Sequence, residues 1–104
     1  VKQNNLYVKM PYKNLVFAKS SGNYVELMTS GQKRYMLKTS IQHIANSLNY
    51  DRIIRIHRSY LINIDHLVEF STQEVTLSNG CILPIGKHYQ ENFINLVLNC
   101  PVLM

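Results

Sequence analysis

The chain has 104 residues, 46% of them hydrophobic, and a formal net charge of +5 at pH 7. This length suits a single domain, residues 1–104, with a core of its own, and the hydrophobic content excludes a disordered chain. No apolar run reaches membrane-spanning length and no signal-peptide pattern opens the chain, so we expect a cytoplasmic domain. Because the chain starts at Val1 rather than Met, we expect it to be a piece of a longer protein.

The positive charge is concentrated in the first half of the chain. Residues 1–50 contain seven Lys or Arg against a single Glu, whereas residues 51–104 contain four against five acidic residues. Such an excess favours binding to nucleic acid or to an anionic surface, although many proteins with other functions are equally basic. Cys81 and Cys100 form no spacing motif, and we expect free thiols.

The N-terminal half predicts a meander of short strands. Short apolar runs are separated by turn residues, which is typical of strands rather than helices. Residues 20–23 predict a loop in which Gly22 is free to adopt a positive φ, and Ser30-Gly31 predicts a hairpin turn. The predicted strands cover residues 6–10, 15–18, 24–28 and 34–37.

One internal helix follows this meander. Thr39 or Ser40 can cap its N-terminus, and Asn49 ends it. Its apolar stripe, at helical spacing, consists of Ile41, Ile44, Ala45 and Leu48.

The C-terminal half predicts further strands and a second helix. Asn79-Gly80 is the strongest hairpin signal in the chain. A helix over residues 90–98 has Phe93, Leu96 and Val97 on its apolar side, which we expect to cover a sheet, and Pro101 ends it. The predicted strands cover residues 53–57, 60–62, 68–70, 74–77 and 81–85.

The stretch from residue 55 to residue 63 reads Arg-Ile-His-Arg-Ser-Tyr-Leu-Ile-Asn. Alternation predicts that Ile56 points to one side of a strand while Arg55 and His57 point to the other. Arg58 and Ser59 then interrupt the alternation. Cations and hydrogen-bond donors on a rigid, apolar-anchored edge suit the binding of a polyanion in a fixed register.

These residues resemble the signature of the LytTR family, the DNA-binding output domains of bacterial response regulators. Residues 14–25 and 82–87 resemble, in order and spacing, the first and last recognition loops of the same family. The resemblance covers roughly residues 5 to 97. It implies a mainly β fold, an elongated arrangement of small stacked antiparallel sheets with one or two short helices. The opening hairpin of the family is expected here to be reduced to the single strand over residues 6–10.

The resemblance also implies a role for individual residues. At two positions this chain departs from the family, with Tyr24 in place of histidine or arginine and Gly86 in place of a common serine. Arginine can donate two hydrogen bonds to guanine, whereas lysines, hydroxyls and backbone amides hold phosphates. The implied base-reading residues are Tyr24, Arg58 and Lys87. The implied phosphate-contacting residues are Ser20, Ser21, Asn23, His57 and Ser59, and we predict the same role for the basic side chains of Lys19 and Arg55.

Catalytic and metal sites are not indicated by the sequence. The four histidines, His43, His57, His66 and His88, match no zinc spacing, so we expect neither a metal nor a cofactor. No Ser–His–Asp order, phosphate-binding glycine loop or close carboxylate pair stands out, and we expect a protein that is not an enzyme.

The resulting hypothesis is sequence-specific binding of double-stranded DNA by a two-component response regulator. The resemblance implies loops inserted into successive major grooves of direct-repeat sites, a receiver domain before Val1 and a partner sensor histidine kinase. It leaves open a homodimer on paired DNA sites. The alternative is a β-rich interaction module that binds a protein or peptide through a sheet edge.

Overall fold

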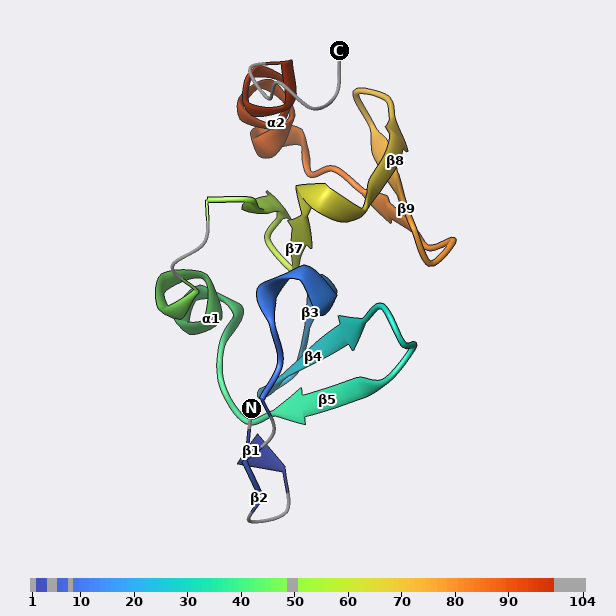
Figure 1. The fold of residues 1–104 in the computed structure, drawn as a ribbon. Helices are drawn as coiled ribbons and strands as arrows, with labels where there is room; N and C mark the ends of the chain where they lie inside the picture. The colour runs from blue at the N-terminus through green and yellow to red at the C-terminus, as the bar shows by residue number, and fades with distance from the viewer. Residues whose placement is uncertain (1, 4–5, 8, 49–50, 99–104) are drawn as a thin grey trace.

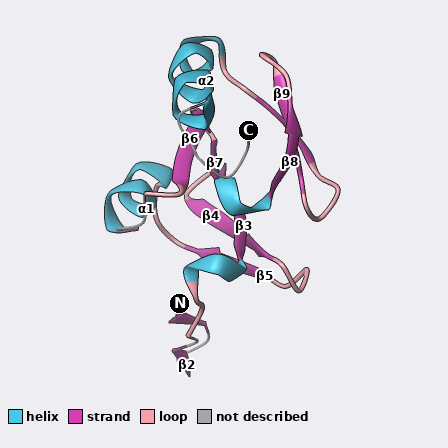
Figure 2. Cartoon of the chain, turned by 45° about the horizontal axis from the view of Figure 1, so that its top comes forward, coloured by secondary structure: helices cyan, strands magenta, loops and turns pink. Residues whose placement is uncertain are grey.

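The computed structural model describes residues 2–3, 6–7, 9–48 and 51–98 of the chain. These residues form three antiparallel sheets and two α-helices in an elongated body with principal extents of 42 × 25 × 24 Å (Figure 1). Figures 1 and 2 both place the N-terminal strands and the C-terminal helix at opposite ends of the long dimension. The mainly β fold of small antiparallel sheets with two short helices is therefore confirmed.

The largest sheet has five strands in the order β5-β4-β3-β7-β6. Every strand that was predicted in this part of the chain is present, and the turn at Ser30-Gly31 joins β4 to β5. The strands are β3 (Leu15–Ser21), β4 (Tyr24–Thr29), β5 (Arg34–Leu37), β6 (Ile53–His57) and β7 (Tyr60–Asn63).

A three-stranded sheet packs beside the larger one, with the order β10-β9-β8. Its strands are β8 (Leu67–Phe70), β9 (Glu74–Leu77) and β10 (Ile82–Pro84). The predicted Asn79-Gly80 turn joins β9 to β10, with Gly80 at φ 87° and the Asn79 Oδ1 accepting the Cys81 amide at 3.1 Å. Cys81 is a free thiol, whereas Cys100 lies outside the described residues.

The N-terminal strands correct one prediction. β1 (Lys2–Gln3) and β2 (Leu6–Tyr7) pair antiparallel in a sheet of their own, so the opening hairpin is present although it is very short. A single strand over residues 6–10 is therefore wrong. Strands of two residues are too short for alternating hydrophobicity to indicate them, which is why the sequence showed only one.

The first helix, α1 (Ile41–Ser47), begins as predicted. The Ser40 Oγ accepts the His43 amide at 3.0 Å, which satisfies one of the amides that a helix N-terminus leaves unpaired. Ile41 and Ile44 are buried on its inner face. The predicted stop at Asn49 lies outside the described residues.

The second helix, α2 (Gln90–Leu98), also has its predicted bounds, and Pro101 lies outside the described residues. Phe93 and Val97, one helical turn apart, are completely buried. Leu96 is 44% exposed, so its predicted place on the buried side is wrong. A stripe four residues apart fits the helical period better than one three residues apart in this short helix.

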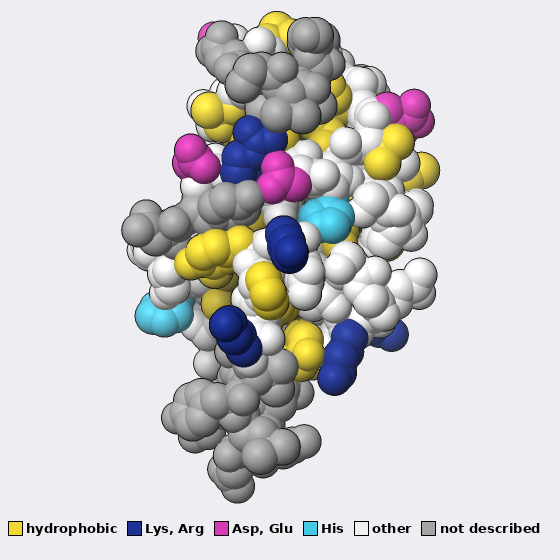
Figure 3. All heavy atoms as spheres, viewed as in Figure 1, with side chains coloured by type: hydrophobic (Ala, Val, Ile, Leu, Met, Phe, Trp, Pro, Cys, Tyr) yellow, Lys and Arg dark blue, Asp and Glu magenta, His cyan; other side chains and the backbone are white. Residues whose placement is uncertain are grey.

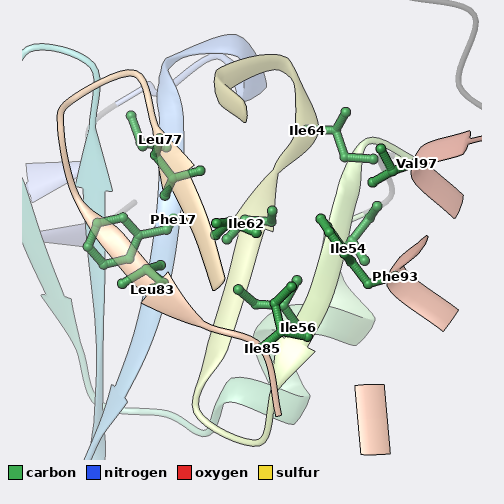
Figure 4. Packing of buried hydrophobic residues seen from close by; sticks show 12 residues of the cluster. Phe17, Ile54, Ile56, Ile62, Ile64, Leu77, Leu83, Ile85, Phe93 and Val97 are labelled. Carbon is green, nitrogen blue, oxygen red and sulfur yellow. The ribbon is translucent and has the colours of Figure 1, made fainter. Parts of the chain in front are cut away.

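Hydrophobic clusters cover both faces of the five-stranded sheet. On the face toward α2, side chains from the larger sheet, the smaller sheet and α2 meet, and in Figure 4 Phe93 and Val97 point toward Ile54 and Ile64. On the face toward α1, Ile41 and Ile44 of the helix pack on the sheet. The α1-side cluster consists of Leu15, Ala18, Val25, Leu27, Tyr35, Ile41, Ile44 and Leu61.

A buried asparagine joins the sheet to the segment that enters it. The Asn63 side chain is completely buried and donates from Nδ2 to the carbonyls of Tyr12 at 3.0 Å and Leu15 at 2.9 Å. Its Oδ1 accepts the Asp65 amide at 3.0 Å. Asn63 thus satisfies backbone groups of η1 (Tyr12–Asn14), β3 and η2 (Ile64–His66).

We predict that Asn63→Leu lowers the free energy of unfolding by about 2–4 kcal/mol, because it leaves two carbonyls and one amide without their partner. Urea denaturation followed by circular dichroism measures this change. The matched control is Asn95→Leu on the exposed side of α2, expected to change stability by less than about 0.5 kcal/mol. Equal stability of the two variants would contradict a structural role for Asn63.

Candidate nucleic-acid interface

Three segments that are distant in sequence meet through main-chain hydrogen bonds. The Ser20 amide donates to the Ser59 carbonyl at 2.9 Å, which joins the end of β3 to the turn between β6 and β7. The Gly86 amide donates to the Ile56 carbonyl at 2.7 Å, which joins the segment after β10 to β6. These two main-chain bonds therefore join the three segments singled out in the sequence.

The first segment is a tight hairpin rather than the wider loop that was predicted. Ser21 pairs directly with Tyr24 across β3 and β4, so Ser20 and Ser21 belong to a strand and only Gly22-Asn23 form the turn. Gly22 has φ 60° while Asn23 does not have a positive φ, the combination found in type II′ turns. Short polar side chains do not prevent a strand from continuing, which is why the strand end was placed too early.

The second segment is the turn at Arg58-Ser59, between β6 and β7. The Ser59 amide donates to Nδ1 of His57 at 3.0 Å, so in the neutral ring the proton lies on Nε2. A bulge interrupts the pairing just before this turn: Arg55 pairs with Leu61, and His57 pairs with Tyr60.

The bulge corrects the predicted alternation. The His57 ring lies 5.3 Å from the Tyr60 ring, on the α2 side, where Tyr60 packs on the hydrophobic cluster. Arg55, opposite Leu61, faces α1 instead. Arg55 and His57 therefore do not share a face, because the extra residue of a bulge reverses the phase of the strand.

The third segment packs directly on His57. A Cβ atom added at Gly86 would lie 3.4 Å from Cδ2 of His57 and 3.1 Å from Cδ2 of Tyr89, so this approach requires glycine or a shift of the rings. Lys87 follows at the start of η3 (Lys87–Tyr89) and is exposed. The close contact therefore presents Lys87 beside the second turn.

The three implied base-reading side chains are accessible. Arg58 and Lys87 are exposed, and Tyr24 is 44% exposed. Within the described part of the chain, no hydrogen bond or ion pair engages any of these three side chains. Their donors are therefore available to a ligand.

Six of the seven residues expected to contact phosphate lie on or beside the first hairpin, and the seventh is Arg55. Lys19, Ser21 and Asn23 are exposed along the first hairpin, and Ser20, His57 and Ser59 are half-buried beside it. Arg55 differs, because its guanidinium donates to the carbonyls of His57 and Arg58 and to Oε1 of Gln42 in α1.

A hollow beside the first hairpin contains residues that the sequence did not single out. It is lined by Ser20, Gly22 and Asn23 of the hairpin. Lys38, in the segment before α1, and Gln42, in α1, line its other side. Nothing in the sequence places Lys38 or Gln42 near the hairpin, since the contact depends on how α1 packs on the sheet. Both are exposed and carry hydrogen-bond donors at the rim of the candidate interface.

Charge is distributed unevenly over the surface. On the face shown in Figure 3, the carboxylates lie in the upper half, whereas most Lys and Arg side chains lie lower, over the region of β3, β4 and β5. The Arg34–Glu26 ion pair, 3.4 Å between nitrogen and oxygen, links neighbouring strands of this basic half. The electrostatic field of such a charge distribution favours approaches in which the basic half of the domain faces a polyanion.

The remaining polar clusters have structural contacts. The His66 ring lies between the Ser78 Oγ at 2.7 Å from Nδ1 and the Lys13 carbonyl at 2.6 Å from Nε2, so it bridges three segments. Among the described residues, no three His, Cys, Asp or Glu side chains are grouped so that they could hold a metal ion. None of the described helices is long and apolar enough to cross a membrane.

Comparison with known proteins identifies the family. A family model described as the LytTr DNA-binding domain matches residues 5–97. The transcriptional regulatory protein LytR of Staphylococcus aureus strain N315 is 29% identical over 76 residues, which cover 68% of this chain and 31% of that protein. A solved LytTr DNA-binding domain from Bacillus cereus has the same fold, with a TM-score of 0.78 at 20% identity over 92% of both chains. The chain therefore belongs to the LytTr DNA-binding domain family.

Proposed function

We propose that this domain binds double-stranded DNA in a sequence-specific manner through the surface formed by its three joined segments. The observation that supports the proposal is the pair of main-chain bonds, from the Ser20 amide to the Ser59 carbonyl and from the Gly86 amide to the Ile56 carbonyl, which join the three segments that carry Tyr24, Arg58 and Lys87. Their side chains are accessible, and two of them are cationic. Membership of a DNA-binding family supports the same conclusion.

Within this surface the work is divided between base edges and the phosphate backbone. Arg58 presents a planar fork of donors that matches O6 and N7 of guanine, whereas Lys87 supplies an ammonium group with three donors and Tyr24 a single hydroxyl. Lys19, Ser20, Ser21, Asn23, His57 and Ser59 offer donors suited to phosphate oxygens. His57 is suited to this role because its Nδ1 is occupied by the Ser59 amide, which leaves Nε2 as the donor.

The larger assembly is proposed from the family and its relatives. The chain spans about a third of the length of the LytR relative, which is named as a transcriptional regulatory protein. We infer that it is the output domain of a cytoplasmic, non-enzymatic regulator that has an N-terminal receiver domain and is controlled by a sensor histidine kinase. Loops in successive major grooves and homodimers on direct repeats are part of the proposal, and they rest on the family resemblance.

The first test is the salt dependence of DNA binding. If the domain neutralises about four to six phosphates, log K should fall against log salt concentration with a slope of about −4 to −5. Fluorescence anisotropy with a labelled duplex at several salt concentrations measures the slope. A slope near zero would contradict the proposal and favour the sheet-edge interaction module instead, because that binding does not depend on release of counterions.

The second test asks whether the first hairpin docks on DNA. Gly22→Val should weaken DNA binding while the domain stays folded, because a valine at φ 60° costs about 1–2 kcal/mol and alters the turn. Gly31→Val is the matched control, since it also lies in a hairpin turn with open space around it but does not have a positive φ. Both variants are compared by anisotropy and by urea denaturation. Full DNA affinity in a folded Gly22→Val variant would exclude this hairpin from the interface.

The third test separates base reading from phosphate contact. Arg58→Ala should cost about 1–3 kcal/mol on a duplex selected from a random pool and much less on random duplex. Lys19→Ala should weaken both duplexes alike and make the salt slope shallower by about one unit, because lysine acts as a point charge. Titrations of both duplexes at two salt concentrations distinguish a base contact from a phosphate contact. Equal losses on both duplexes for Arg58→Ala would make Arg58 a phosphate contact.

A further inference from the structure

Arg55 is held by the protein on three sides. It is half-buried in β6, and all three of its guanidinium nitrogens donate hydrogen bonds. Nε donates to the His57 carbonyl at 3.2 Å, and Nη2 donates to the Arg58 carbonyl at 2.6 Å. Nη1 donates to Oε1 of Gln42 in α1 at 2.7 Å. A guanidinium is a rigid planar fork, so these bonds fix the relative positions of their acceptors.

The two carbonyls are significant because of where they lie. The His57 carbonyl belongs to the peptide group before the Arg58 Cα, and the Arg58 carbonyl belongs to the peptide group after it. Each peptide group is planar, so fixing the orientation of both groups fixes φ and ψ of Arg58. The backbone dihedrals in turn set the direction in which the Arg58 side chain leaves the turn.

We infer that Arg55 is a positioning residue that aims Arg58 and couples its turn to α1 through Gln42. The inference rests on the proposed function, because Arg58 is the residue proposed to read a base. It replaces the phosphate contact predicted for Arg55 from the sequence with an internal clamp. Lysine cannot substitute for this clamp, because one ammonium nitrogen cannot bond three acceptors placed around a planar fork.

The chain offers a matched control for this substitution. Arg34 is also an arginine in a strand of the same sheet, but it is exposed and contacts a single partner, with Nη1 at 3.4 Å from the Glu26 carboxylate. Arg34→Lys therefore repeats the chemical change of Arg55→Lys without altering a turn. Gln42→Met removes one acceptor of the clamp at an exposed helix position. It also removes the hydrogen bond from Gln42 Nε2 to Oδ1 of Asn46, one helical turn further on, which should change stability by less than about 0.5 kcal/mol.

The first experiment measures the clamp in the 104-residue chain without DNA. Amide hydrogen exchange is followed by NMR at Ser59 and Ser20, whose amides bond to groups of the turn. In Arg55→Lys both amides should exchange about tenfold faster, because the turn opens more often when its carbonyls lose the guanidinium. Arg34→Lys should leave both rates unchanged. Unchanged exchange in Arg55→Lys would overturn the inference.

The second experiment measures DNA binding by the same variants. Arg55→Lys should lower affinity for the selected duplex about tenfold and for random duplex less than about twofold, with the salt slope unchanged because the positive charge is kept. Gln42→Met should cause a smaller loss, about threefold, on the selected duplex alone, and Arg34→Lys should match the parent chain. Full affinity of Arg55→Lys for the selected duplex, or equal losses on both duplexes, would overturn the inference. If the parent chain binds neither duplex, the proposed function fails, while the exchange experiment still decides the role of Arg55.

Discussion

The end of β6 and the turn that follows it are hydrogen-bonded to two other segments, and the candidate interface depends on these bonds. The Ser20 amide donates to the Ser59 carbonyl, and the Gly86 amide donates to the Ile56 carbonyl. Both contacts are between main-chain groups, so they constrain where the three segments lie without using a side chain that could contact DNA. The segments are anchored in a buried sheet, because β3 and β7 are neighbouring strands whose apolar residues are covered on both faces. Rigid support of this kind allows an exposed turn to present a side chain in a defined direction.

The proposed interface combines two kinds of interaction with different ranges. Lysines along the strands supply a positive field that acts over about a Debye length and does not depend on base sequence. Hydrogen bonds from Arg58 form only when its guanidinium reaches the edge of a base. They discriminate between bases only if the side chain is held in one orientation. The two cations near the turn therefore differ in the tasks proposed for them: Lys19 is exposed, whereas the guanidinium of Arg55 is hydrogen-bonded within the protein. Counting positive charges would treat these two residues as equivalent.

Much of the fold could be predicted from the sequence, because local patterns determine it. The Ser40 cap, the Ser30-Gly31 and Asn79-Gly80 turns and the bounds of α2 all follow from rules that act over a few residues. The bulge in β6 could not be predicted, since it arises from pairing with β7 and reverses the side of His57 relative to Arg55. The Arg55–Gln42 contact could not be predicted either, because it depends on how α1 packs against the sheet. The family resemblance indicated the three segments, but the bonds that join them are long-range.

Gly86 determines how closely the segment after β10 approaches β6 and η3. A Cβ added at this position would lie 3.1 Å from the Tyr89 ring and 3.4 Å from the His57 ring. The segment cannot move away from His57 without losing the 2.7 Å bond from the Gly86 amide to the Ile56 carbonyl. A side chain at position 86 would therefore have to displace one of the two rings or break this bond. Because Lys87 follows directly, this packing constrains the point from which its side chain extends relative to the turn at Arg58-Ser59. The role proposed for Lys87 therefore depends on the glycine that precedes it.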